Sequence, residues 1–281
     1  MSHLGIPKTY KLFIGGKFPR TESGRILEVR GPTGEFLANA SRASRKDFRN
    51  AVVAARKASG GWAKSTAYLK GQILYRIAEI LDGRSDQFVN ELVGQGLPET
   101  KARTDVSEAV DLLVHYAGWS DKYQALFSTV NPVASPHFNF STPEPVGVVG
   151  IIAPRRGSLP ELVSAIAPAL VGGNAVVALA GESALTAISF AEVLATSDVP
   201  GGIVNILTGH RDELVPEFAK HMDVNAVLLC SDDADERKIA ELEAVENLKR
   251  MSLQPDRSLS PSPYHILDFQ EIKTTWHPVG V

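Results

Sequence analysis

The sequence has little cysteine, little net charge and no long apolar run. Its 281 residues include one cysteine, Cys230, which cannot form an internal disulfide or, without clustered histidines, a thiolate zinc site. The formal net charge of -3 gives no global attraction to nucleic acid or to anionic membranes. No stretch reaches the ~18 apolar residues of a membrane span, and the first ten residues lack a secretory signal pattern. These absences predict a cytoplasmic protein that binds neither nucleic acid, nor membrane, nor metal.

The chain nevertheless contains enough apolar material for a large core, because 44% of its residues are hydrophobic. Residues 1–126 are predicted to begin with a hairpin that turns at Gly15-Gly16, since paired glycines adopt positive φ easily. Mainly helical structure follows. The first helix should begin after Ser44, because Ser44 and Asp47 have the spacing of a capping box. Further helices are expected around residues 69–81, 88–93 and 106–123.

Residues 146–253 alternate between short apolar runs and stretches of helical periodicity. The apolar runs are predicted strands at 146–153, 175–180, 203–207 and 224–230. Helices are expected between them at 162–171, 184–195 and 212–221. Strands that alternate with helices over short loops are typical of parallel βαβ units. The sequence therefore predicts an α/β fold with an open, Rossmann-type parallel sheet.

Three further segments surround this region. Residues 127–145 are poor in charge and interrupted by prolines, which favours an extended excursion or a hairpin edge. A short Pro- and Ser-rich linker is expected at 254–263. Residues 264–281 end in a predicted strand in which Ile272, Thr274 and Trp276 alternate with more polar neighbours. A terminal strand needs a sheet to join.

Several blocks, in order along the chain, resemble the aldehyde dehydrogenase superfamily. They are Leu12 to Gly16, Pro145 to Gly150, Ile166 to Leu170, Gly173 to Val177, Pro200 to Ile206, Leu248 to Leu253 and Asp268 to Trp276. In that family a catalytic domain with a nucleophilic cysteine lies between the last two blocks, whereas here only a short linker separates them. The chain thus resembles a shortened member, similar to the cysteine-less C-terminal domain of two-domain aldehyde dehydrogenases.

The resemblance also implies how the β segments assemble. It implies a small β oligomerisation subdomain built from the N-terminal hairpin, residues 127–142 and the C-terminal strand. Phe269, Ile272, Thr274 and Trp276 are then the expected oligomerisation residues.

All three catalytic positions that the resemblance identifies are changed in this chain. Cys230 falls at the end of a cofactor-domain strand and not in the catalytic loop, which favours a small buried hydrophobic side chain. The asparagine that holds the oxyanion aligns with Arg156, which is longer and charged. The general-base glutamate aligns with Gln254, which cannot accept a proton at neutral pH. We therefore predict no catalytic residues and no enzyme activity for the isolated chain.

The cofactor-binding blocks of the family are also altered. The block whose lysine and glutamate hold the adenosine ribose keeps Glu182 but has no lysine. The phosphate-side loops read Gly209-His210-Arg211 and Cys230-Ser231-Asp232, so glycines that let a phosphate approach are lost. We therefore expect no cofactor. NAD(P) is expected only if the chain is an active aldehyde dehydrogenase. The vestigial cleft is expected to comprise Pro154, Arg155, Glu182, Gly209 and Ser231.

Two questions stay open at this point. Arg155, Arg156 and Arg211 are either solvated loop charges or a rebuilt anion site. Three functions are open for the chain. It is a non-catalytic subunit that assembles with itself or with a full-length aldehyde dehydrogenase. Alternatively, it is an NAD(P)-dependent aldehyde dehydrogenase, or it is a nucleotide-binding or sensing module. The first function is favoured, because interface strands are kept while the chemistry is lost.

Overall fold

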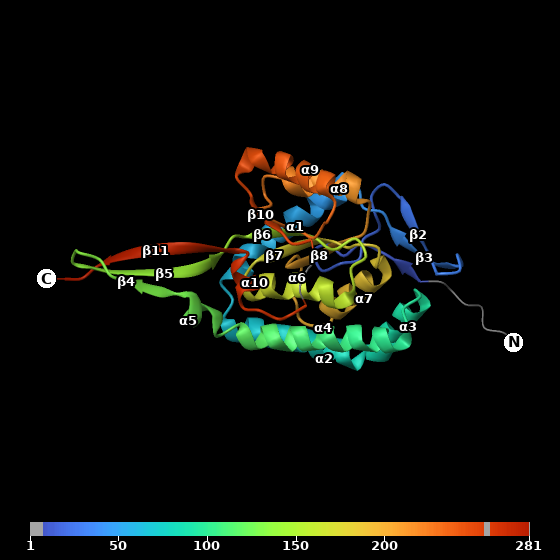
Figure 1. Ribbon diagram of the computed structural model, residues 1–281, viewed down its shortest axis with the longest axis horizontal. Helices are drawn as coiled ribbons and strands as arrows, with labels where there is room; N and C mark the ends of the chain where they lie inside the picture. The colour runs from blue at the N-terminus through green and yellow to red at the C-terminus, as the bar shows by residue number, and fades with distance from the viewer. Residues whose placement is uncertain (1–7, 256–258, 281) are drawn as a thin grey trace.

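The computed structural model describes residues 8–255 and 259–280 (Figure 1). Two predicted features lie outside the described residues. One is the N-terminal segment 1–7, for which no secretory signal was predicted, and the other is the middle of the predicted linker, 256–258. Within the described ranges, no helix is both long and apolar enough to cross a lipid bilayer.

A five-stranded parallel sheet forms the centre of the protein. Its strands, in spatial order, are β10 (Arg250–Leu253), β9 (Ala226–Leu229), β6 (Val148–Ile152), β7 (Ala175–Leu179) and β8 (Val204–Leu207). Every residue of β6 to β9 is buried, whereas the edge strand β10 is half-buried. Such continuous apolar strands need helices on both faces. The predicted α/β class with an open parallel sheet is confirmed.

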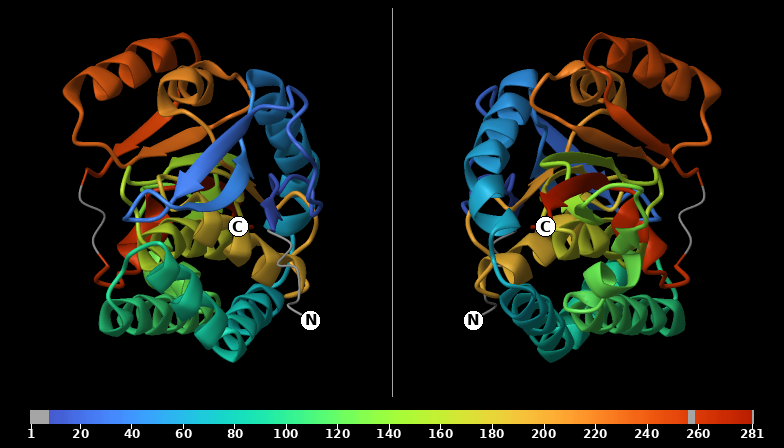
Figure 2. Two further views of the ribbon diagram at one scale, coloured as in Figure 1. Left: turned by 90° about the vertical axis from the view of Figure 1, so that its right-hand side faces the viewer. Right: turned by 90° about the vertical axis from the view of Figure 1, so that its left-hand side faces the viewer.

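Helices cover both faces of this sheet (Figures 1 and 2). On one face lie α1 (Arg45–Ala63), α8 (Arg211–Lys220) and α9 (Ala234–Ala244), which continues into the short helix η1 (Val245–Asn247). On the other face lie α6 (Leu159–Val171) and α7 (Ala184–Ala195), with α2 (Ala67–Gly83), α3 (Ser85–Gly94) and α4 (Glu99–Trp119) outside them. The chain therefore buries its core between the sheet and these layers.

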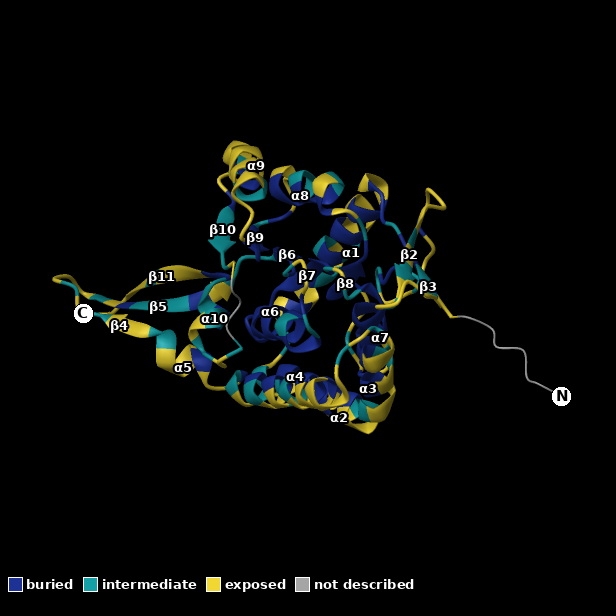
Figure 3. Ribbon diagram, turned by 45° about the vertical axis from the view of Figure 1, so that its right-hand side comes forward, coloured by how far each residue is buried: buried dark blue, intermediate teal, exposed yellow. Residues whose placement is uncertain are grey.

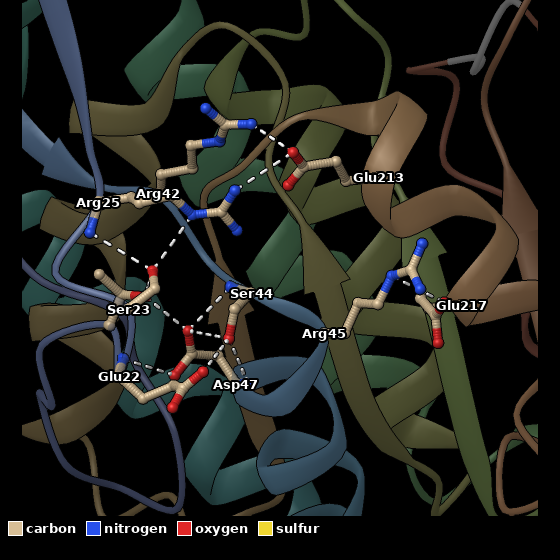
Figure 4. Close-up of polar contacts among 10 residues, drawn as sticks. Glu22, Ser23, Arg25, Arg42, Ser44, Arg45, Asp47, Glu213 and Glu217 are labelled. Carbon is tan, nitrogen blue, oxygen red and sulfur yellow. Dashed lines mark hydrogen bonds and ion pairs between the residues drawn. The ribbon is translucent and has the colours of Figure 1, made fainter.

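The first long helix starts where the sequence predicts. Ser44 caps α1, and its hydroxyl accepts a hydrogen bond from the backbone of Asp47, 3.2 Å away, while Asp47 Oδ2 accepts from the Ser44 amide at 2.8 Å (Figure 4). Thr21 Oγ1 also donates to Asp47 Oδ2, at 2.7 Å. The capping box is confirmed, and it also fixes the preceding loop.

The N-terminal segment differs in part from its prediction. Gly15 and Gly16, with φ of 62° and 75°, form the expected tight turn, but Phe13 beside it pairs with Ile206 of β8. The hairpin therefore does not join residues 127–142, as the resemblance implied. Phe13 is 2% exposed, so burying this apolar side chain against the open edge of the main sheet explains the placement.

A separate small sheet also forms near the N-terminus. It consists of β1 (Thr9–Tyr10), β3 (Phe36–Ser41) and β2 (Ile26–Arg30), with β3 in the centre. The hairpin of β2 and β3 was not predicted, although residues 31–34 read Gly-Pro-Thr-Gly, a clear turn signal.

The remaining strands form what we call the arm, a three-stranded antiparallel sheet in the order β11-β5-β4. Its strands are β4 (Thr129–Asn131), β5 (His137–Pro145) and β11 (Gln270–Pro278), and the short helices α5 (Tyr123–Phe127) and α10 (Tyr264–Leu267) lie at its root. The arm projects from the body, and few of its residues are buried (Figures 1 and 3). The C-terminal strand therefore joins a sheet formed by residues 127–145, the segment predicted to be an extended excursion.

Candidate functional site

The single thiol lies inside the protein. Cys230 directly follows β9 and is 1% exposed. Its amide donates to the carbonyl of Ile152, 3.0 Å away, as a continuation of the parallel sheet. This placement agrees with the interpretation of Cys230 as a small buried side chain, because a nucleophilic thiol must be reachable by its substrate.

Arg211 is a buried charged group at the carboxyl edge of the sheet. Its Nη2 lies 2.6 Å from Glu236 Oε2 and its Nε lies 2.9 Å from Oε1, so the pair is bidentate and joins α8 to α9. The same guanidinium donates to the carbonyls of Ala153 and Cys230, which follow β6 and β9. With 7% of its side chain exposed, Arg211 is not the solvated loop charge that one interpretation of the sequence suggested.

The carboxylate of Glu236 responds to this arrangement. Burial alone raises its pKa, but the hydrogen bonds from Arg211 and Ser231 and the charge of Arg211 outweigh burial, so its pKa lies below the ordinary value. Glu236 therefore stays ionised and neutralises the buried arginine. The sequence did not reveal this pairing, since the two residues are 25 positions apart and only the fold brings them together.

The other two arginines lie on the surface. Arg156 has 90% of its side chain exposed and approaches Glu182 at 3.8 Å, while Arg155 approaches Glu236 at 3.8 Å. The long, exposed pair of Arg156 and Glu182 contributes little. Arg155 and Arg211 thus approach the same carboxylate, that of Glu236, whereas Arg156 does not join them.

The loops after β6 and β7 rest directly on one another. The amide of Glu182 donates to the carbonyl of Arg155 at 2.7 Å. A Cβ atom at Gly181 would lie 2.2 Å from the carbonyl oxygen of Pro154, so only glycine allows this approach. The contact closes part of the edge at which open α/β sheets bind ligands.

The structure brings part of the expected vestigial cleft together. A cavity of about 360 Å³ is lined by Arg155, Glu182, Gly209 and Arg211, and by residues 27–30 of β2. Pro154 and Ser231 are not among its lining residues. Ser231 is instead buried beside α9, where its hydroxyl accepts a hydrogen bond from the Asp233 amide at 3.3 Å.

Asp233 caps α9. Its Oδ1 accepts hydrogen bonds from the amides of Asp235 and Glu236, 3.0 and 3.1 Å away. The hydrogen bond from the Glu236 amide, and then that from the Asp235 amide, lower the pKa of Asp233. The carboxylate thus occupies the N-terminus of α9, the position where a bound anion would otherwise be favoured.

Gln254 fixes the path of the chain after β10. Its Nε2 donates to Ser252 Oγ and to Asp268 Oδ2, both at 3.0 Å. Asp268 lies directly before the root of β11, so the amide ties the end of the main sheet to the start of the arm. At this position a glutamine stabilises structure through donation, which a carboxylate could not do.

The arm presents the predicted alternation. Ile272, Thr274 and Trp276 lie on one face, where they oppose Pro143, Ser141 and Asn139 of β5. Ile272 and Trp276 are 58% and 57% exposed, so the described chain does not cover them. The hydroxyls of Thr274 and Ser141 are 2.8 Å apart.

Phe269 does not lie on this surface. It is 0% exposed and packs in the core of its own chain, and its carbonyl accepts a hydrogen bond from Asn174. Its expected role as an interface residue is therefore corrected. Phe269 precedes β11 at the point where the chain leaves the body, and a large apolar side chain is buried there.

Comparison with known proteins decides the family. The family model described as "Aldehyde dehydrogenase family" matches residues 18–255. The chain belongs to the aldehyde dehydrogenase family. In this aldehyde dehydrogenase family member the match ends shortly after β10, so β11 and α10 lie beyond it.

Several relatives are similar over most of the chain. Cytosolic 10-formyltetrahydrofolate dehydrogenase of Xenopus tropicalis is 31% identical over 262 residues, which cover 90% of this chain and 29% of that protein. Mitochondrial benzaldehyde dehydrogenase of Antirrhinum majus is 32% identical over 250 residues, which cover 87% of this chain and 46% of that protein.

Solved structures agree with this. HpcC from Thermus thermophilus superposes with a TM-score of 0.82 at 29% identity, covering 88% of this chain and 48% of that one. The NAD+ complex of an aldehyde dehydrogenase from Bacillus cereus gives a TM-score of 0.82 at 26% identity, covering 88% and 50%. This aldehyde dehydrogenase family member therefore spans about half the length of these solved chains, and 29% of the Xenopus tropicalis relative.

Proposed function

We propose that this chain is a non-catalytic subunit of the aldehyde dehydrogenase family that acts by assembly, with itself or with a full-length aldehyde dehydrogenase. The observation that carries the proposal is the arm, which projects from the body (Figure 3) and exposes large apolar side chains. Val130, Phe138, Ile272 and Trp276 are between 47% and 67% exposed. Solvent-exposed apolar residues gathered on a small sheet favour a partner that covers them.

The loss of chemistry is the second support. Acyl transfer through a thiohemiacetal needs a reachable thiolate, a donor for the oxyanion and a base for the hydrolytic water. The only cysteine is buried, Arg156 points into solvent and Gln254 is neutral. Ten residues, 254–263, separate β10 from α10, too few to build a further domain.

Dinucleotide binding fits these residues poorly. Arg211 is neutralised by Glu236, and Asp233 occupies the N-terminus of α9. The loops after β6 and β7 touch, with the carbonyl of Arg155 bonded to Glu182. A pyrophosphate would have to displace these contacts, so we propose that the chain needs no cofactor. As a separate point, we propose that it works in the cytoplasm.

Two measurements test the proposal. Native mass spectrometry is carried out on the purified chain alone and after mixing with a full-length aldehyde dehydrogenase from the same host. In at least one of the two samples, this chain should be part of an assembly larger than its own 30.3 kDa. A chain that stays monomeric in both experiments contradicts the proposal. The isolated chain should also form no NADH from aldehydes. Aldehyde-dependent NADH formation that Cys230→Ala abolishes would show that the chain is an enzyme.

The cavity of about 360 Å³ beside Arg155 and Glu182 favours a second candidate, a nucleotide-binding or sensing module. Cavities of this size accommodate small ligands. Calorimetry with NAD, NADP and adenine nucleotides separates the two functions, because only a nucleotide-binding module gives saturable heat. The matched control is Gly181→Leu, whose side chain clashes with the loop that borders the cavity.

A further inference from the structure

A groove lies on the outer surface of the protein, between α2 and α4 (Figures 1 and 2). Its volume is about 670 Å³, which lies within the range of small-molecule sites. None of the residues of the expected vestigial cleft lines it. The groove is therefore separate from the region where the family binds its cofactor.

Small residues form the floor of the groove. Gly71 of α2 lies against Ala117 and Gly118 of α4, and a Cβ atom at Gly71 would be 3.1 Å from the carbonyl oxygen of Ala117. The two helices can approach so closely because glycine has no side chain to separate them. Above Gly118 the space is open, since a Cβ atom there would meet only the Nζ of Lys122, 3.7 Å away. A flat molecule can thus lie directly on the helix backbones.

Two tyrosines rise beside this floor. Tyr68 and Tyr75 line the groove and are 73% and 59% exposed. They are seven residues apart on α2, so they share one face of the helix and lie about 10 Å apart along its axis. Val114 of α4 adds apolar surface opposite them. Aromatic rings pack favourably against other aromatic rings, so these walls favour a ligand with an aromatic ring.

One anion and one cation in the groove are free. Asp121 and Lys122 follow α4 and line the groove, and neither forms an ion pair within residues 8–255 and 259–280. The ammonium of Lys122 lies 5.8 Å from the centre of the Trp119 ring. Arg76 and Glu79, which also line the groove, satisfy each other at 2.7 Å. The free charges are therefore one of each sign, and they complement a zwitterion.

We infer that this groove binds an aromatic α-amino acid. The aromatic ring lies on the glycine floor beside Tyr68 and Tyr75, the carboxylate pairs with Lys122, and the ammonium pairs with Asp121. An aromatic acid or an aromatic amine would leave one of the two free charges unmatched. No residue of the arm lines the groove, so this binding is independent of the assembly proposed above.

Three related ligands test the recognition of both charges by calorimetry. L-tryptophan should bind saturably, whereas tryptamine and indole-3-propionate should each bind about fivefold more weakly, because each loses one exposed ion pair. Lys122→Met should weaken the binding of L-tryptophan by the same factor and leave that of tryptamine unchanged. Asp121→Asn should weaken the binding of L-tryptophan and leave that of indole-3-propionate unchanged.

A blocking variant tests the location. Gly118→Leu fills the open floor and should abolish the binding of all three ligands. Gly60→Leu on α1 is the matched control, because a Cβ atom there also meets nothing within 4 Å, and it should leave binding unchanged. Circular dichroism confirms that both variants fold. Gly181→Leu should also leave the binding of L-tryptophan unchanged, which separates the groove from the cavity beside Arg155.

The outcomes that would overturn the inference are distinct from those that test the proposed function. No saturable heat with L-tryptophan, equal affinities for the three ligands, or binding that survives Gly118→Leu each overturns it. So does a Gly118→Leu variant that disrupts an assembly seen by native mass spectrometry, because the groove is then covered by protein. The first three outcomes leave the proposed assembly standing, and the last supports assembly at a different surface.

Discussion

Asn174 connects the main sheet to the arm through Phe269, because its Nδ2 donates to the Phe269 carbonyl at 3.0 Å. Its Oδ1 accepts from the amide of Gly147, 2.9 Å away, at the start of β6. Asn174 is fully buried, so these bonds are shielded from water. Together with the Val146 amide and the Gln270 side chain, which also donate to the Phe269 carbonyl, Asn174 fixes the direction in which β11 leaves the body.

We expect Asn174→Ala to destabilise the protein by about 2 kcal/mol, because it leaves the Gly147 amide without its partner and removes one of the hydrogen bonds to the Phe269 carbonyl, which keeps those from Val146 and Gln270. The measurement is the urea midpoint of unfolding. Hydrogen exchange should also quicken along β11, since its root is loosened. Asn90→Ala, an exposed position on α3, is the control and should change stability by less than about 0.5 kcal/mol. Equal effects of the two variants would show that Asn174 does not anchor the arm.

The buried pair of Arg211 and Glu236 makes a second prediction. Arg211→Met should cost about 3 kcal/mol at neutral pH, because it leaves the buried carboxylate of Glu236 with only the more distant Arg155 as a cationic partner. Arg103→Met removes an exposed pair with Glu99 and should cost at most about 1 kcal/mol. Chemical denaturation of both variants gives the comparison. A small effect of Arg211→Met would mean that Glu236 gains water or another cation.

The same variant predicts a change in pH dependence. In the native protein the pKa of Glu236 lies below its ordinary value of 4.5, so its contribution to stability is present above pH 4.5 and is lost as pH falls through the lowered pKa. Without Arg211, burial raises that pKa instead. The variant should then be less destabilised at pH 5 than at pH 7. Parallel stability curves of variant and native protein between these pH values would contradict this.

The sequence predicted most of the fold, because the signals for it are local. The spacing of Ser44 and Asp47 located the start of α1, and four apolar runs located β6 to β9. The start of α4 was missed by seven residues, since its first turns from Glu99 to Asp105 are mostly polar and carry little periodicity. Boundaries without an apolar signal are set by packing, which a single sequence does not reveal.

Less of the candidate site could be predicted. The exposure of Ile272 and Trp276 on one face followed from their alternation. The pairing of Arg211 with Glu236 did not, because it depends on how α8 and α9 lie against one another. The burial of Phe269 could not be predicted either, because the sequence does not distinguish an apolar residue that packs in the core from one that lies at an interface. Long-range contacts of this kind require the fold.

Lys249 gives the last prediction, on the alkaline side. Burial lowers its pKa to about 8 from the ordinary 10.5, although its ammonium donates to the carbonyls of His221 and Val224. Because the unfolded chain then binds more protons between these pH values, the stability of the native protein should rise as pH increases from about 8. Lys249→Met cannot titrate, so the native protein should gain on the variant over this range. The measurement is the difference between the two urea unfolding free energies at pH 7, 8 and 9.5. Taking that difference also cancels the titration of Tyr123, whose pKa burial raises. A difference that stays constant with pH would mean that Lys249 is hydrated in the native state and keeps its ordinary pKa.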